Sequence, residues 1–285
     1  SSRPMTIEAL NQVLTFADQE NPDLYLTKPT LMNMMKDAGY KTYWITNQQT
    51  ISKRNTMLTN FSKQMDEQYY MNHSRAQNSR EYDGNVFAPF EKVLNDDAPR
   101  KFIVIHLLGT HMKYDYRYPP EFAQFSDGSD LSAELSEDEK TVVNSYDNAV
   151  LYNDHVISTL IHTLDDTDHR AALVYLSDHG EDVFDTPPHD MLGRNEGKPS
   201  LAMYAVPFIL WTSPEWQSAT PRQFNDQLER PYSTAHFIHT WSDLAGLTYD
   251  GYDASKSLIN PEFVRHPLWI GDPENRDGLR ELLLE

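Results

Sequence analysis

The sequence predicts an α/β fold in which a mostly parallel sheet is sandwiched between helices. Short apolar runs typical of buried strands alternate along the chain with amphipathic stretches typical of helices, and polar residues follow directly where several strand-like runs end. The chain has 285 residues, of which 39% are hydrophobic, so it can form a sizeable core. We expect a single domain over residues 1–285.

The first helix is predicted over residues 7–16, "IEALNQVLTF", where apolar side chains recur at helical spacing. Thr6 stands directly before this stretch, and Glu8 lies in its first turn. A hydroxyl residue before a helix and an acid inside its first turn are the usual pattern of a capped N-terminus. The sequence therefore predicts that Thr6 is the N-cap of this helix.

A helix followed by a strand is predicted next. Residues 30–39, "TLMNMMKDAG", have helical periodicity and end at Gly39, a residue suited to closing a helix. Residues 41–46, "KTYWIT", are rich in β-formers and lead into the polar turn at residues 47–49, "NQQ". The two elements form a helix-to-strand unit of the kind that builds parallel sheets.

The remaining elements continue this alternation. We expect, in chain order, a strand in the apolar run at 101–111, a long amphipathic helix at 142–164, strands at 171–177 and 204–213, and a late helix at 234–247. Residues 119–139 are rich in Ser, Asp and Glu, and we expect them to form a solvated excursion. In such folds functional groups gather at the carboxyl ends of the strands.

Composition excludes several classes of function. The formal net charge of -19, from 24 Lys and Arg against 43 Asp and Glu, argues against a nucleic acid or an anionic lipid surface as the main partner. There are no cysteines, which excludes disulfides, thiolate nucleophiles and cysteine metal sites. Any metal must therefore be bound by His, Asp, Glu or hydroxyl groups.

The chain shows no membrane-crossing or signal segment. No stretch approaches the about 20 apolar residues of a membrane span, and nothing at Ser1 resembles a signal peptide. The sequence begins "SSRPMT", without an initiator methionine, and enters a helical pattern at once. We therefore expect it to be a fragment of a longer protein.

Three predicted strands end in unusual side chains. The first leads to residues 47–49, the second carries His106 and His111 in "HLLGTH", and the third ends at Asp178 and His179. We expect these ends to face one crevice. Asp178 and His179 make a plausible half of a zinc site, which needs three or four ligands in all.

Each of these candidates has a simpler interpretation. An Asp-His pair after a strand is often only a turn, although the following "GE" and the separate "HLLGTH" favour a site. Thr6 at a helix N-terminus lies where a phosphate prefers to bind, and a metal would lower the pKa of its hydroxyl; taken alone, it is simply a cap. His106 can equally be a hydrogen-bonded core histidine, whereas His189, ten residues after His179, can fold back over the same edge.

Several motifs together resemble a known enzyme family. "YLSDHGE", "HLLGTH" and "YRYP" resemble the zinc-dependent phosphoethanolamine transferases of Gram-negative envelopes, which belong to the alkaline phosphatase and sulfatase superfamily. The resemblance spans essentially the whole chain. "SRPMTIEALNQVLTF", "YWITNQQT", "KRNTMLT" and "NSYDNAVLYND", in this order, are most similar to the branch that modifies the lipopolysaccharide core.

The resemblance implies a role for individual residues. Asp178 and His179 match the family's zinc ligands, and Thr6 matches its threonine nucleophile, which also contacts the metal. His111 and His189 match histidines that line the phosphate and can hold a second zinc. Looser matches to substrate-binding positions are Gln48, Gln49 and Lys53, from "TNQQTISK".

The sequence departs from the family in one respect. The family's remaining zinc ligand is a glutamate that follows its first strand, upstream of the nucleophile, and this sequence starts too late to contain it. The family's N-terminal membrane-spanning region is also outside the sequence. We therefore expect a single catalytic domain without its first strand, with weak zinc binding.

The implied reaction has two steps. Zinc-activated Thr6 attacks phosphatidylethanolamine, diacylglycerol leaves, and a hydroxyl or phosphate on a lipopolysaccharide sugar takes the phosphoethanolamine from Thr6. The residues alone do not distinguish core heptose, lipid A phosphate and periplasmic glucan as the acceptor, and the resemblance favours core heptose. The implied location is the periplasmic side of the bacterial inner membrane, with one zinc ion and room for a second, and no nucleic-acid partner. Alternatives are a phosphate-ester hydrolase, a phosphoglycerol transferase, or an envelope binding domain without catalysis.

Overall fold

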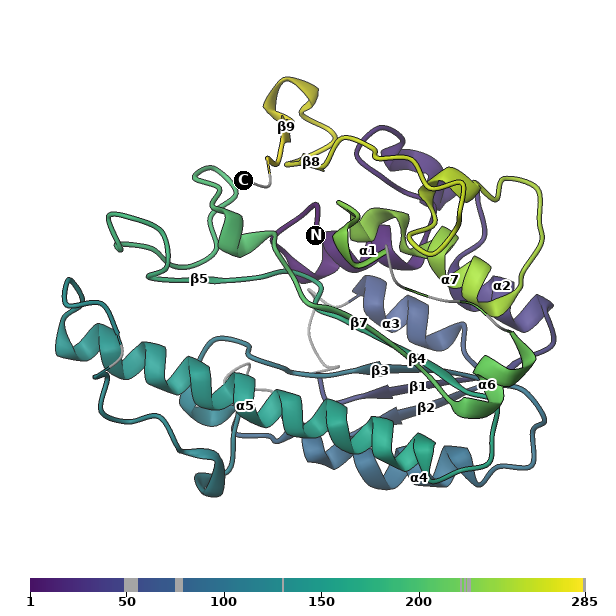
Figure 1. Cartoon of the computed structure of the whole chain (residues 1–285), viewed down its shortest axis with the longest axis horizontal. Coiled ribbons are helices and arrows are strands. Elements are labelled where there is room, and N and C mark those ends of the chain that lie inside the picture. Colours follow the sequence, from purple (N-terminus) through teal and green to yellow (C-terminus); the bar gives the residue numbers. More distant parts are fainter. Residues whose placement is uncertain are drawn as a thin grey trace. The chain divides into compact units, whose positions relative to one another are not determined.

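The computed structural model describes residues 1–48, 56–74, 79–129, 131–220, 222, 224 and 227–283. It divides into two compact units, each built from separate stretches of the chain. The first unit comprises residues 1–34, 168–181 and 194–285, and the second comprises residues 35–167 and 182–193. Figure 1 shows the elements of both units.

The second unit contains a three-stranded parallel sheet in the order β2-β1-β3. Its strands are β1 (Lys41–Thr46), β2 (Glu67–Tyr70) and β3 (Lys101–His106), and Thr46 at the end of β1 pairs with both Tyr70 and His106. The central strand β1 is buried from Thr42 onward. The strand predicted at 41–46 is therefore confirmed, and the strand predicted at 101–111 exists but ends at His106. The α/β class with a parallel sheet is also confirmed.

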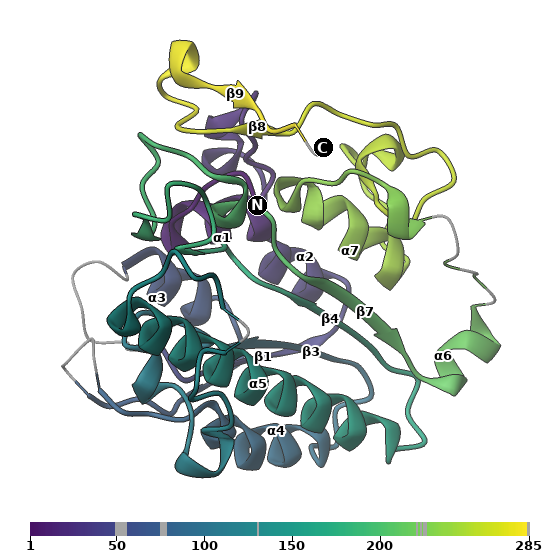
Figure 2. The ribbon, with the colours of Figure 1, turned by 60° about the vertical axis from the view of Figure 1, so that its left-hand side comes forward.

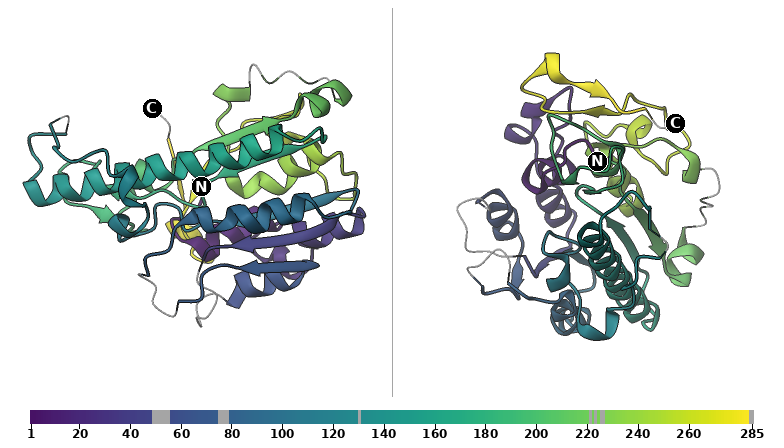
Figure 3. Two further views of the ribbon diagram at one scale, coloured as in Figure 1. Left: turned by 90° about the horizontal axis from the view of Figure 1, so that it is seen from below. Right: turned by 90° about the vertical axis from the view of Figure 1, so that its left-hand side faces the viewer.

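Helices of the second unit accompany this sheet. They are α3 (Thr56–Lys63), α4 (Phe87–Leu94) and the long α5 (Glu137–Asp165), and α4 contacts β1. The helix α2 (Leu31–Asp37) begins in the first unit and ends in the second. Figures 2 and 3 show α4 and α5 running side by side along the strands. A capping box between Ser136 and Glu139 starts α5, which therefore begins inside the segment predicted to be a solvated excursion. A short pair, β5 (Asp182–Val183) and β6 (Leu192–Gly193), completes the unit.

The first unit is built around α1 (Thr6–Leu14) and an antiparallel strand pair. The pair joins β4 (Ala172–Leu176) to β7 (Phe208–Thr212), so these two predicted strands exist but run in opposite directions. Its other elements are α6 (Pro214–Ala219), α7 (Phe237–Ala245), which packs against α1, and the short pair β8 (Trp269–Ile270) and β9 (Arg280–Glu281). Gly246, in the left-handed region with φ 68°, ends α7.

Within the described part of the chain, none of the helices combines the length and the apolar character needed to cross a bilayer. The longest, α5, has 29 residues and is amphipathic, with charged residues in its first turn.

Candidate active site

Thr6 is the first residue of α1 and not its N-cap. The N-cap is Met5, which has an extended backbone and no capping side chain, so the predicted capping role of Thr6 is wrong. The Thr6 hydroxyl instead lies 3.3 Å from Nε2 of His179. The chain before it is anchored by buried Arg3, whose guanidinium pairs with Glu196 at 2.8 Å and Asp272 at 3.4 Å.

Asp178 and His179 follow the end of β4 after one intervening residue, Ser177, so they lie at the carboxyl end of a strand as the sequence predicted. Nδ1 of His179 lies 3.0 Å from the carbonyl oxygen of Gly180, so Nδ1 carries the proton and donates to that oxygen. Nε2 therefore carries the lone pair of the ring, and both the Thr6 hydroxyl and Nη1 of Arg194 lie close to it. Oδ2 of Asp178 lies 3.4 Å from the same Nε2. The structure thus brings three predicted site residues together within the first unit.

This arrangement fits a zinc ion. Adjacent ligand atoms of a tetrahedral zinc site with N and O ligands are about 3.3–3.4 Å apart, and the two distances above match this spacing. The tautomer of His179, set by its bond to a backbone carbonyl, is the one that presents Nε2 to a metal. No group of three or more His, Cys, Asp or Glu side chains suited to a metal occurs among the residues that the structure describes. A zinc ion on Asp178 and His179 would need at least one further ligand, and the Thr6 hydroxyl, 3.3 Å from Nε2, is placed to be one.

Gly180 fixes the position of His179. Its N–H donates to the carbonyl oxygen of Met203 at 2.9 Å, and a Cβ at this position would lie 2.0 Å from the carbonyl oxygen of Ala202. The turn is also fixed by Ser177, whose hydroxyl donates to the carbonyl oxygen of His179 at 2.7 Å. Only glycine allows this close approach of two backbone segments, a requirement that our sequence analysis missed.

Arg194 is a second residue that the sequence analysis missed. Its Nη1 is in very close contact with Nε2 of His179 and lies 3.4 Å from the carbonyl oxygen of Pro4. Its Nε lies 3.4 Å from Oε1 of Glu181, whose side chain is almost fully buried. In the sequence, Arg194 is the only basic residue from 171 to 197 apart from the histidines, and this isolation in an acidic stretch is a signal that could have identified it.

In the second unit, the ends of β1 and β3 meet through hydrogen bonds. The Asn47 N–H donates to the carbonyl oxygen of His106 at 3.0 Å, and the Gln48 side chain donates to that of Leu107 at 3.0 Å. Gln48 is therefore engaged by its own unit's backbone. Gln49 and Lys53, the other predicted substrate contacts, lie outside the described residues.

Buried Asp83 holds this strand end in place. Its carboxylate accepts hydrogen bonds from the backbone N–H groups of Leu108 at 2.9 Å and Gly109 at 2.7 Å, and from the Asn47 side chain at 2.9 Å. Burial raises the pKa of Asp83, although each of these three donors favours the ionised form. Gly109 has a φ of 58°, so the turn after β3 uses a backbone conformation that favours glycine.

His111 and His189 both lie in the second unit. Nδ1 of His111 is 3.3 Å from the carbonyl oxygen of Met112, and its own carbonyl oxygen accepts from Arg117 at 3.1 Å. Nδ1 of His189 lies 2.6 Å from the carbonyl oxygen of Phe184, which leaves Nε2 as the acceptor nitrogen in the neutral ring. That Nε2 lies 3.4 Å from exposed Glu134. Catalytic roles for these histidines remain predictions.

Comparison with known proteins identifies the family. The sulfatase family model matches residues 1–247. The chain belongs to the sulfatase family. The predicted alkaline phosphatase and sulfatase-like fold is thereby confirmed.

Similar proteins include phosphoethanolamine transferases of two bacteria. It is 57% identical over 280 residues to phosphoethanolamine transferase EptC of Escherichia coli K12, covering 98% of this chain and 48% of the relative. It is 59% identical over 280 residues to phosphoethanolamine transferase CptA of Salmonella typhimurium LT2, again covering 98% and 48%. The domain thus spans about half the length of these relatives.

Solved structures support the same assignment. The crystal structure of the C-terminal periplasmic domain of EptC from Escherichia coli, in complex with Zn, matches with a TM-score of 0.96 and 57% identity, covering 99% of this domain and 79% of that chain. The soluble domain of lipooligosaccharide phosphoethanolamine transferase A from Neisseria meningitidis matches with a TM-score of 0.75 at 20% identity, covering 93% and 80%, which shows a shared fold.

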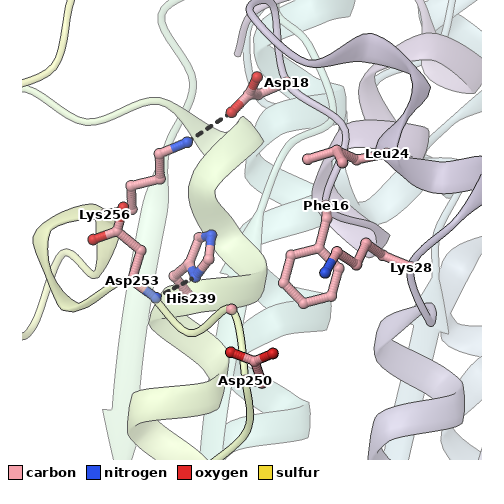
Figure 4. Close-up of a pocket in the computed structure, with 9 residues that line it drawn as sticks. Phe16, Asp18, Leu24, Lys28, His239, Asp250, Asp253 and Lys256 are labelled. Atoms are coloured by element: carbon pink, nitrogen blue, oxygen red, sulfur yellow. Dashed lines mark hydrogen bonds and ion pairs between the residues drawn. The ribbon is translucent and has the colours of Figure 1, made fainter.

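The sulfatase-family domain also has a pocket of about 150 Å³ within its first unit, away from the Thr6 cluster in sequence. Phe16, Leu24 and Lys28 line one side, and His239 and Lys256 lie opposite (Figure 4). Nζ of Lys256 pairs with Asp18 at 2.7 Å, and Nδ1 of His239 accepts from the Asp253 N–H at 3.2 Å. Burial, reinforced by the charge of Lys256, lowers the pKa of His239 to about 4.

Because the pKa of buried His239 is lowered, we expect the free energy of unfolding to depend on pH. The neighbouring His236 has its pKa lowered to about 3, again mainly by burial. Between pH 6.5 and pH 4 the unfolded chain binds protons at both positions while the folded domain does not. The free energy of unfolding should therefore fall as pH falls through this window, by about 1.4 kcal/mol per pH unit for each histidine. Urea unfolding at several pH values measures this slope.

Substitution of His239 separates its contribution to the pH dependence of unfolding from that of other titrating groups. His239→Asn keeps an acceptor for the Asp253 N–H and should reduce the slope by close to one proton between pH 6.5 and pH 4. His169→Asn, at an exposed position of the same unit, should leave the slope unchanged. An unchanged slope in His239→Asn would show that His239 is protonated in the folded domain at these pH values.

Proposed function

We propose that this domain is the catalytic part of a zinc-dependent enzyme that transfers phosphoethanolamine from phosphatidylethanolamine to a lipopolysaccharide sugar, with Thr6 as the nucleophile. The observation that carries the proposal is the placement of the Thr6 hydroxyl 3.3 Å from Nε2 of His179, next to Asp178. Support comes from 57% identity to the EptC domain of Escherichia coli, which was crystallised with Zn. In this proposal the domain works on the periplasmic side of the inner membrane.

Thr6, Asp178 and His179 would hold the zinc ion. When bound, zinc lowers the pKa of a coordinated hydroxyl and offsets negative charge at a phosphoryl group. The first turn of α1 adds to this environment, because Thr6 is the first helical residue and the backbone N–H groups of a first turn have no partner within the helix. These donors and the positive end of the helix dipole favour a phosphate beside Thr6.

The reaction proceeds in two displacements at phosphorus. Thr6 Oγ1 gives its proton to solvent water and forms a bond to phosphorus, while the bond from phosphorus to the diacylglycerol oxygen breaks. The departing oxygen takes a proton from His111 or His189, a general-acid role that we assign on the family resemblance. An acceptor hydroxyl then attacks phosphorus and gives up its proton, and Thr6 Oγ1 departs and is reprotonated.

The acceptor is proposed to be core heptose, again on the family resemblance. The test uses the full-length protein in detergent, phosphatidylethanolamine labelled in its ethanolamine group, and lipopolysaccharide with or without the heptose region. Label should move to the heptose-containing acceptor alone, and slowly or not at all to water. A matched reaction without acceptor measures hydrolysis.

The other outcomes distinguish the alternatives. Rapid release of free phosphoethanolamine without acceptor would indicate a phosphate-ester hydrolase. Equal labelling of both lipopolysaccharides would place the acceptor on lipid A. A donor left intact under all conditions, by protein with zinc bound, would indicate a different donor, as in a phosphoglycerol transferase, or a binding domain without catalysis.

A further inference from the structure

The Arg194 guanidinium lies beside the proposed nucleophile. Its Nη1 contacts Nε2 of His179, the same nitrogen that lies 3.3 Å from the Thr6 hydroxyl. Nη1 is also 3.4 Å from the carbonyl oxygen of Pro4, two residues before Thr6. A cation is thus held within reach of any group that is attached to Thr6 Oγ1.

The position of this guanidinium is set from its Nε side. Nε lies 3.4 Å from Oε1 of Glu181, whose side chain is 4% exposed, whereas the Arg194 side chain is 21% exposed. Glu181 belongs to the same turn as His179, so it ties the base of the guanidinium to the site. Within the described residues, Nη2 has no hydrogen-bond partner. The outer edge of the planar group therefore keeps N–H donors available to a ligand.

The N–H donors of the Arg194 guanidinium suit the oxygens of the phosphoryl group that the proposed reaction places at Thr6. Nε2 of His179 has one lone pair, so it cannot accept from Arg194 and bind a metal at the same time. With Nε2 bound to zinc, Nη1 needs another acceptor, while the Glu181 contact keeps the guanidinium nearby. A planar guanidinium matches two oxygens of a phosphate with parallel hydrogen bonds, which makes arginine especially suited to phosphate recognition.

We propose that Arg194 binds the non-bridging oxygens of the phosphoryl group at Thr6, in the donor and in the phosphoethanolamine-threonine intermediate. This inference rests on the proposed function. It assigns a substrate-binding role to a residue outside the predicted site. No bond is made or broken by Arg194 itself, because it supplies only hydrogen bonds and charge.

The test measures phosphate binding, which does not require transfer. The zinc-loaded full-length protein is titrated with inorganic phosphate by calorimetry, and zinc per chain is measured on the same samples. Arg194→Gln should weaken phosphate binding about tenfold or more, the usual scale for a charged hydrogen bond, with zinc content unchanged. Arg194→Lys keeps the positive charge but loses the paired N–H donors of the guanidinium, so its phosphate affinity should lie between those of the parent and Arg194→Gln.

Two further results would overturn the inference. Phosphate affinity of Arg194→Gln within twofold of the parent would mean that Arg194 does not contact the anion. Parallel loss of zinc and phosphate would mean that Arg194 positions His179 instead. Arg222→Gln is the control, because Arg222 pairs with Asp243 at 2.8 Å and has no contact with Thr6 or His179; its phosphate affinity should equal that of the parent.

The outcome is distinguishable from failure of the proposed function. If Thr6 proves not to be the nucleophile but Arg194→Gln still weakens phosphate binding, the anion site stands without the transfer mechanism. If Thr6 is the nucleophile and phosphate binding is unchanged in Arg194→Gln, only the role of Arg194 is wrong.

Discussion

Thr6→Ala in the full-length protein should abolish phosphoethanolamine transfer, with a loss in kcat of about 10⁴-fold or more, as for other lost nucleophiles. The methyl group leaves no oxygen to attack phosphorus, and no other hydroxyl side chain is recorded in contact with Nε2 of His179 among the described residues. Release of labelled diacylglycerol from phosphatidylethanolamine measures the first displacement directly.

Two variants serve as controls for this experiment. Thr6→Ser keeps the hydroxyl at the start of α1 and should retain measurable transfer. Thr27→Ala removes a hydroxyl from an exposed position of the same unit, where it contacts only the carbonyl oxygen of Leu24, and should leave kcat unchanged. Donor turnover by Thr6→Ala at a rate close to that of the parent would exclude Thr6 as the nucleophile.

Gly180→Ala should damage both stability and zinc binding. The added Cβ would lie 2.0 Å from the carbonyl oxygen of Ala202 and 3.2 Å from that of Ala205, and backbone atoms cannot rotate away as a side chain does. We expect a loss of about 3 kcal/mol in the free energy of unfolding, at the upper end of the usual range for overpacking. Whatever shift relieves the clash displaces His179, the preceding residue, so zinc affinity should fall as well.

Gly197→Ala is the matched control for this substitution. Gly197 lies in the same unit, is exposed, and its added Cβ would meet only the Asn195 side chain at 3.3 Å. Its free energy of unfolding should change by no more than about 0.5 kcal/mol. Urea unfolding followed by circular dichroism compares the two variants. Equal stability of Gly180→Ala and Gly197→Ala would contradict the close packing of residue 180 on residues 202–205.

Strands with continuous apolar and β-branched sequence were predictable from the sequence. The strand predicted at 41–46 matches β1 to the residue, because burial on both faces imposes such a pattern. The strand predicted at 101–111 corresponds to β3, which ends earlier, at His106, before the turn that contains Gly109. Strand β2, "EQYY", was missed because it has four residues, two of them polar. The antiparallel direction of β7 relative to β4 was also beyond prediction, since side-chain pattern does not depend on strand direction.

The candidate site was predicted only in part for similar reasons. Asp178 and His179 are adjacent in sequence and follow a strand, so a local pattern revealed them. Thr6 was found as a candidate, but its capping role was wrong because the helix begins at Thr6 itself, and its N-cap is Met5, a residue with no capping group. Gly180 was missed because its close contact with Ala202 is tertiary and leaves no local signature in sequence. Arg194 had a local signal, its isolation in an acidic stretch, but its contact with Pro4 could not be read from the sequence.

The central claim is that Thr6 carries the phosphoethanolamine between donor and acceptor. The most direct measurement is mass spectrometry of the labelled peptides. The zinc-loaded full-length protein is incubated with labelled phosphatidylethanolamine and no acceptor, and the reaction is quenched in acid before the label is located. The account predicts phosphoethanolamine on the peptide that contains Thr6, and none in Thr6→Ala. Donor turnover with no modified peptide, or with label on another residue, would contradict it.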